Sequence, residues 1–298
     1  MVLESLVSTK GMTKKKRWIF VLGIVYVFVA SFLSTLIFSS RTSLVMVVLT
    51  SLAAVPLMYK TIREEELRDV EEDVPETTLL KEHFHVLEGY MALFLGVTLG
   101  FVLLYVLLPS GALQSYFELQ VETLKGINSE ITGYSFEGFE SFANIFLNNL
   151  QVLSLAVVFS FIFGAGAIFI LVWNASVIGA AIGNFITNNL ELIEDSIGWE
   201  NLCSQFFVVN FGLFRYAIHG VPEILAYFVG ALAGGIIAFA VIRHDFMSKK
   251  FESIVLDSAD LLLIGIGLLF VSAVLEVWVT PLLFNVEMFD MMLSSCSV

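Results

Sequence analysis

The chain has 298 residues, of which 58% are hydrophobic and only 14% are charged, whereas soluble proteins carry about 25% charged residues. This composition excludes a soluble globular domain and predicts an integral membrane protein. The net charge of −13 argues against nucleic acid as a partner, because phosphate binding needs a surplus of Lys and Arg.

The N-terminal part is predicted to form a transmembrane hairpin. Residues 1–17 are a short basic arm, and Trp18–Phe38 is the first apolar run. About 20 apolar residues cross a bilayer, so this run is predicted to be a span, because a cleaved signal has a shorter apolar region. Leu44–Tyr59 is a second, shorter span, which makes residues 18–59 a hairpin. Residues 60–83 are a charged cytoplasmic linker.

The middle of the chain is predicted to contain three further spans and one long loop. The third span is Phe84–Leu108, and an outer loop over residues 109–142 follows it. Within the loop, apolar residues at helical spacing predict an amphipathic helix around Leu113–Leu124. The fourth and fifth spans are Ala143–Ile162 and Ile168–Ile186, separated by a Gly-Ala-Gly-Ala hinge.

The next apolar stretch, Phe206–Ile242, contains Gly220 and Pro222 near its middle. Proline removes a backbone donor and disrupts a helix. We therefore expect a break here, with a broken or re-entrant segment near residues 203–222 and a new helix from Glu223.

These elements predict an all-α fold, a polytopic helical membrane protein with about seven crossings. Ala259–Phe284 is the last span, residues 84–284 form the membrane domain, and residues 285–298 are a tail. Twelve of the 15 Lys and Arg residues lie in the arm, the linker and a patch at 243–250. Basic loops favour the cytoplasmic side, which predicts a cell-membrane protein with a cytoplasmic N-terminus. A full crossing by residues 203–218 would instead place the 243–250 patch outside, and this alternative stays open.

Four residues of the interrupted stretch form a candidate polar cluster: Arg215, His219, Gly220 and Glu223. Ionisable side chains inside lipid are costly and mark a functional site or a structural lock. Arg215 is a natural ion-pair partner for Glu223, and His219 can donate to a free carbonyl at the break. We interpret the cluster as a clamp on the helix break, while a proton or ion relay and a metal site remain alternatives. Glu276 is a further intramembrane acid that can pair with Arg215 across helices.

Asn148, Asn149 and Asn174 lie in the fourth and fifth spans. Amides in lipid hydrogen-bond between helices, so we interpret them as contacts between spans, with the lining of a polar cavity as the alternative. Cys203 and Cys296 are far apart in the sequence and predict neither a disulfide framework nor a zinc motif.

The sequence lacks the signatures HExxH, GxSxG and a nucleotide-binding glycine loop. We therefore expect no enzyme activity, no cofactor and no metal.

The segment HGVPEILAYFVGALAGG, which contains His219, Gly220 and Glu223, resembles the signature of the stage II sporulation protein M family. The upstream segment with Asn148-Asn149 is also similar. Where the family often has Asn-Gly, this chain has Asn174-Ala175. The resemblance covers about residues 84–242, so the hairpin and the charged linker look like additions.

The resemblance implies a membrane scaffold, because sporulation members of the family hold peptidoglycan-degrading enzymes. We therefore expect a non-enzymatic protein that organises membranes and recruits partners through the 110–142 loop or the charged linker. The expected partners are the lipid bilayer and other membrane or cell-envelope proteins, and a homo-oligomer is left open. One alternative is a transporter or channel lined by Arg215, His219, Glu223 and the intramembrane asparagines. A second alternative is an intramembrane metal-dependent hydrolase.

Overall fold

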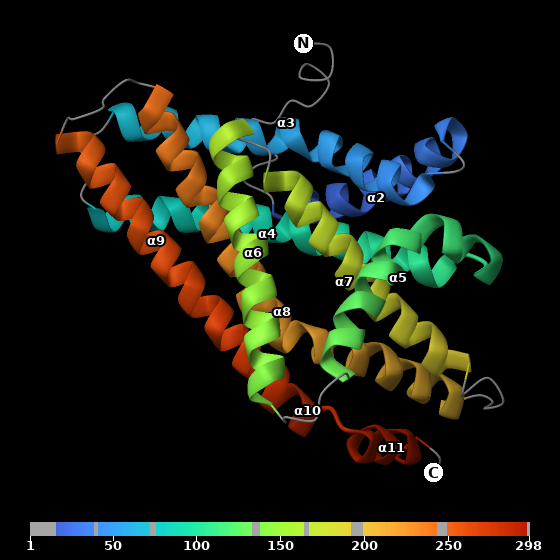
Figure 1. The fold of residues 1–298 in the computed structure, drawn as a ribbon. Helices are drawn as coiled ribbons and strands as arrows, with labels where there is room; N and C mark the ends of the chain where they lie inside the picture. The colour runs from blue at the N-terminus through green and yellow to red at the C-terminus, as the bar shows by residue number, and fades with distance from the viewer. Residues whose placement is uncertain are drawn as a thin grey trace.

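The computed structural model describes residues 16–38, 41–71, 76–132, 138–163, 167–191, 199–242 and 249–296. Within these ranges the chain is helical and contains no strand (Figure 1). Six of the described helices are long and apolar enough to cross a membrane, and a shorter apolar helix covers Thr42–Leu57. The predicted class, a polytopic helical membrane protein, is confirmed.

The helices follow one another with short connections, and most of them match an apolar run of the sequence. Their bounds are α2 Lys16–Ile37, α3 Thr42–Glu71, α4 Glu76–Leu107, α5 Ser110–Thr132, α6 Phe139–Phe163, α7 Ala167–Glu191, α8 Trp199–Ile242, α9 Lys249–Val274, the π-helix η2 Leu275–Val279, α10 Thr280–Leu283 and α11 Val286–Ser294.

The helices α2 and α4 pack with their backbones almost in contact. A Cβ atom on Gly96 would lie 2.0 Å from the Phe20 carbonyl oxygen, and one on Gly23 would lie 2.8 Å from the Leu93 carbonyl oxygen. Small residues allow this close approach, and van der Waals packing holds such helix pairs together in lipid. The two glycines therefore position the first span against the centre of the bundle.

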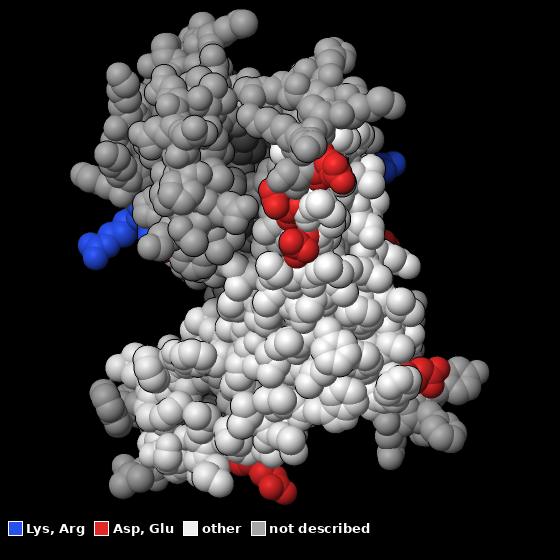
Figure 2. Space-filling model, turned by 90° about the vertical axis from the view of Figure 1, so that its left-hand side faces the viewer, with Lys and Arg blue, Asp and Glu red and all other residues white. Residues whose placement is uncertain are grey.

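The centre of the bundle is apolar, and so is much of its outer surface. Met46, Phe101, Phe117 and Tyr227 are completely buried. Many large apolar side chains are exposed on the outside of the bundle, among them Leu263 at 65%. Figure 2 shows one face on which a broad central zone displays no described Lys, Arg, Asp or Glu side chain. An apolar exterior of this kind fits a protein surrounded by lipid.

The predicted helix around Leu113–Leu124 is confirmed and lies within the longer α5. Its inner face contains Phe117 and Gln120, which are both buried completely. The Gln120 side chain accepts a hydrogen bond from Ser43 of α3 (2.7 Å) and donates one to Ser176 of α7 (3.1 Å). These bonds fasten α5 to the membrane helices, with a kink at Phe117.

The predicted break in the stretch 203–222 is wrong, because α8 is one continuous helix of 44 residues with Pro222 inside it. At about 1.5 Å per residue it is about 66 Å long, roughly twice the 30 Å of a bilayer core. Figure 1 shows α8 changing direction between its first part, near the end of α7, and its last part, beside α9. The proline therefore lies inside the helix without ending it, since neighbouring helices supply replacement partners for the backbone.

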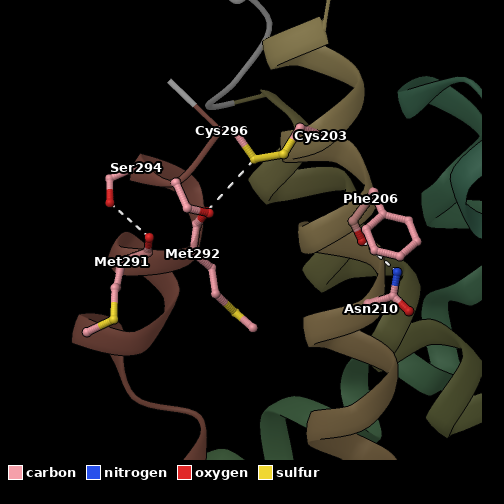
Figure 3. The surroundings of a disulfide bond; sticks show 8 residues. Cys203, Phe206, Asn210, Met291, Met292, Ser294 and Cys296 are labelled. Carbon is pink, nitrogen blue, oxygen red and sulfur yellow. Dashed lines mark hydrogen bonds between the residues drawn. A yellow bond between two sulfur atoms is a disulfide. The ribbon is translucent and has the colours of Figure 1, made fainter. Parts of the chain in front are cut away.

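The two cysteines, whose spacing predicted neither a disulfide framework nor a zinc motif, do form a disulfide. Cys203, near the start of α8, is bonded to Cys296, just after α11, with their Cα atoms 5.6 Å apart (Figure 3). The two residues are 93 positions apart in the sequence. The C-terminal segment folds back onto α8, so the pairing depends on tertiary structure and not on a short motif.

The helix ends fall into two groups. The start of α8 and the end of α11 are joined by the disulfide, and α5 bonds to the neighbouring ends of α2 and α3 through Thr35–Tyr116 and Ser43–Gln120. We call this end of the bundle the disulfide side. The end of α8 and the start of α9 lie together at the opposite end (Figure 1).

Candidate functional site: a polar cluster between α8 and α9

Six polar residues lie on two packed helical segments. His219, Glu223 and Tyr227 are spaced four apart on α8, and Ser272, Glu276 and Thr280 are spaced four apart along α9, η2 and α10. Residues four apart share one face of a helix. We call these six residues the polar cluster.

Hydrogen bonds connect five members of the polar cluster in two groups, and Glu276 takes part in neither. The Tyr227 hydroxyl donates to Oε1 of Glu223 at 2.9 Å. The Ser272 hydroxyl donates to the His219 backbone carbonyl at 2.8 Å, and the Thr280 Oγ1 lies 3.4 Å from Nδ1 of His219. The cluster therefore joins α8 to α9 and to α10 through both side chains and backbone.

The Ser272 bond lies next to the proline of α8. Pro222 has no N–H, so the carbonyl four residues earlier, at Ile218, has no intrahelical donor. The adjacent carbonyl, at His219, accepts the Ser272 hydroxyl. An interhelical donor beside a proline replaces part of what the helix ladder loses, so this contact stabilises α8 where Pro222 interrupts its ladder.

The facing segment is also irregular. Leu275–Val279 form the π-helix η2, in which the Thr280 N–H donates to the carbonyl of Leu275, five residues earlier. Single π turns inside α-helices occur frequently at functional sites. Here the wider turn carries Glu276 and alters which side chains of the segment face α8.

The carboxyl groups of Glu223 and Glu276 lie on the two facing segments of the polar cluster. Both side chains are half-buried, and they lie close enough to interact electrostatically. Two acidic side chains at the interface between membrane helices are unusual, because burying ionisable groups in a membrane costs free energy. Among the described residues, no group of three or more His, Cys, Asp or Glu side chains is placed to hold a metal ion.

Arg215 does not belong to the polar cluster. Its side chain is exposed, and its guanidinium carbon lies 5.9 Å above the centre of the Phe185 ring. No ion pair joins Arg215 to Glu223 or to Glu276, and the structure describes all three residues. The predicted pairings of Arg215 are therefore wrong. Gly220 is next to the cluster, but a Cβ atom there would meet nothing within 4 Å.

The three asparagines lie elsewhere in the bundle. Asn148 is exposed, Asn149 is buried, and the Asn174 amide donates to the Ile170 carbonyl of its own helix at 2.8 Å. No hydrogen bond joins any of them to His219 or Glu223 within the described ranges. The predicted set of site residues is therefore divided, with only His219 and Glu223 in the cluster and Gly220 beside it.

Sequence reasoning missed Tyr227, Ser272 and Thr280. The sequence does contain a signal for them, because each lies four residues from an intramembrane acid, Glu223 or Glu276, and so on the same helical face. Spacing alone, however, does not show which face of one helix packs against which face of another.

The sequence model of the family described as Stage II sporulation protein M matches residues 19–281. The match begins at residue 19, so the hairpin and the charged linker lie within the family's own pattern, and their description as additions is wrong. Comparison with curated proteins and with solved structures finds no match. Because the matched region includes most of the 298 residues, the chain belongs to the Stage II sporulation protein M family.

Proposed function

We propose that this protein is a non-enzymatic membrane scaffold that recruits other membrane or cell-envelope proteins. The observation that carries this proposal is that side chains of the polar cluster form hydrogen bonds with one another and with a backbone carbonyl of α8. Side chains that line a transport path need contact with water or solute. Here Glu223 is bonded by Tyr227 of the same helix, and His219 is bonded across the interface by Ser272, through its carbonyl, and by Thr280, through its ring.

A small cavity in the described part of the chain lies apart from the polar cluster. It has a volume of about 20 Å³, room for roughly one water molecule, and its lining is apolar, with Tyr90, Phe94 and Phe228 among the residues. None of the six residues of the polar cluster lines it. A scaffold needs no larger internal space, and its interactions take place on its surface.

The exposed face of α5 is the proposed recruiting surface. Its inner face is fastened by Gln120, while Glu118, Glu122 and Lys125 are exposed. A helix held by buried hydrogen bonds presents its outer side chains in fixed positions, which lowers the entropy lost on binding a partner.

The orientation proposed for the scaffold places the disulfide side outside the cytoplasm. Disulfides persist in oxidising compartments, and Cys203–Cys296 is on this side. Basic segments favour the cytoplasm, and Lys16, at the start of α2, and Lys249-Lys250, at the start of α9, are at the opposite ends of their spans. Two independent rules therefore support a cell-membrane protein with a cytoplasmic N-terminus and α5 on the outer surface.

Photo-crosslinking in native membranes tests recruitment. A photoreactive amino acid replaces Glu118 on α5 in one variant and the exposed Leu263 of α9 in a matched control. We expect discrete protein adducts from position 118 and only lipid adducts from position 263. The absence of any protein adduct at positions 118 and 122, in cells that express the folded protein, would contradict the proposal.

One observation favours the transporter alternative, namely that the intramembrane acids Glu223 and Glu276 interact electrostatically. A pair of intramembrane acids is a common feature of proton and cation pathways. Under this alternative, proteoliposomes show a pH-dependent ion flux that Glu223→Gln abolishes. Under the scaffold proposal, wild-type and Glu223→Gln proteoliposomes are equally tight.

A further inference from the structure

The short C-terminal helix α11 is amphipathic. The polar side chains Glu287, Asp290 and Ser294 are spaced three and four apart and share one side. The rest of its circumference is apolar and includes three methionines, one phenylalanine and one leucine. The helix begins cleanly, because the Asn285 side chain accepts a hydrogen bond from the Met288 N–H at 2.8 Å.

Only part of this apolar surface contacts the protein. Phe289 packs on Phe211 of α8, with ring centres 5.0 Å apart, and on Phe185 of α7, at 6.1 Å. Figure 3 shows the Met292 side chain turned toward α8 and the Met291 side chain turned away from it. Met291 is 70% exposed, and Met288, one turn earlier, is 36% exposed.

The exposed methionines continue a surface that faces lipid. The outer side of α9 and the following η2 exposes large apolar residues as far as Trp278, and α10 exposes Leu282 at 73% and Leu283 at 43%. Tryptophan is enriched at the boundary between lipid and water. The position of Trp278 thus argues for a membrane boundary near the end of the candidate span Ile254–Leu283, and α11 starts at Val286, just after this span.

We propose that α11 lies in the lipid–water interface on the disulfide side, with Met288 and Met291 inserted among the lipid chains and with Asp290 and Ser294 in water. A helix with one apolar and one polar side takes this position at a bilayer surface. The Cys203–Cys296 disulfide fixes the end of the helix to α8 and so holds it at this depth. Because the ionisable side chains of α11 are acidic, insertion depends on apolar burial and not on attraction to anionic headgroups.

Methionine-methyl NMR of the full chain in lipid nanodiscs tests this placement. The protein carries ¹³C-methyl methionine, signals are assigned with Met→Leu variants, and lipids doped with a doxyl group near the headgroup supply the probe. We expect the Met288 and Met291 signals to lose most of their intensity. The signal of Met46, which is fully buried inside the bundle, is the internal reference and should lose clearly less intensity.

Two results would overturn the proposal. Broadening of Met291 only by a water-soluble gadolinium chelate would place the methionine in water. Protection of Met291 from both reagents would mean that protein covers it, either a second copy or another part of the chain. Neither result depends on the scaffold function, so failure of this inference is separate from failure of that proposal.

A cysteine variant tests the role of the disulfide. In Cys203→Ser/Cys296→Ser, we expect the difference between doxyl and gadolinium broadening of Met291 to shrink, because α11 is no longer held at one depth. An unchanged difference would show that apolar burial alone positions the helix and would refute the part assigned to the disulfide.

Discussion

The interfaces α2–α4 and α8–α9 represent two different ways of joining helices inside a membrane. In the first, Gly23 and Gly96 bring two regular helices into backbone contact. In the second, a proline-containing helix and a π turn meet through the polar cluster. The comparison teaches that glycine contacts fix the frame of this bundle, whereas the polar contacts compensate an irregular backbone.

The largest expected effect comes from the glycine interface. Gly96→Leu places a side chain where the Cβ alone would lie 2.0 Å from the Phe20 carbonyl oxygen, so α2 and α4 must separate. We expect a loss of folded protein equivalent to about 4 kcal/mol or more, measured as the monodisperse fraction in detergent. Gly267→Leu is the matched control, because a Cβ at Gly267 meets nothing within 4 Å. Equal yields of the two variants would refute the close-contact description.

The disulfide should give the next largest effect. It closes a loop between residues 93 positions apart, and disulfides commonly stabilise by about 2–4 kcal/mol. We expect reduction, or the double serine variant, to lower the midpoint of thermal unfolding by several degrees. A midpoint that is identical with and without reductant would mean that the bond carries no stability.

Ser272→Ala sharpens the comparison at the polar interface. It removes the hydroxyl that donates to the His219 carbonyl beside Pro222, and interhelical hydrogen bonds in membranes contribute about 1 kcal/mol. We expect a correspondingly small loss of stability in wild-type protein and a smaller one in Pro222→Ala, where the helix ladder is restored. Equal losses in both backgrounds would show that the serine and the proline are independent.

The smallest effect is expected from Arg215→Ala. Arg215 is exposed and pairs with no acid of the cluster, and an exposed cation–π contact contributes about 0.5 kcal/mol. Thermal unfolding should therefore be nearly unchanged. A loss of thermal stability as large as that of Ser272→Ala would show that Arg215 does contribute to the polar cluster.

The positions of the membrane helices could be predicted because long apolar runs leave the chain few alternatives in lipid. The continuity of α8 could not, because Pro222 and Gly220 read as a break under rules for an isolated helix, and the compensating donor, Ser272, lies 53 residues from His219. The disulfide, the π turn and the position of Arg215 were missed for the same reason, since each depends on which segments pack together.

Only part of the candidate site could therefore be predicted from the sequence. His219 and Glu223 stood out as ionisable residues in an apolar stretch, and the structure places them together. Their partners Ser272, Thr280 and Tyr227 are ordinary residues in membrane helices, and only the α8–α9 contact distinguishes them.

The most direct test of the account is the access of water to the polar cluster. Glu223→Cys and the exposed surface control Glu118→Cys are each treated, with the native disulfide intact, with a hydrophilic maleimide in open membrane sheets. If the protein is a scaffold whose polar cluster is sealed between helices, position 118 reacts readily and position 223 stays unmodified. Modification of position 223 at a rate close to that of position 118 would reveal a hydrated path and would contradict the account.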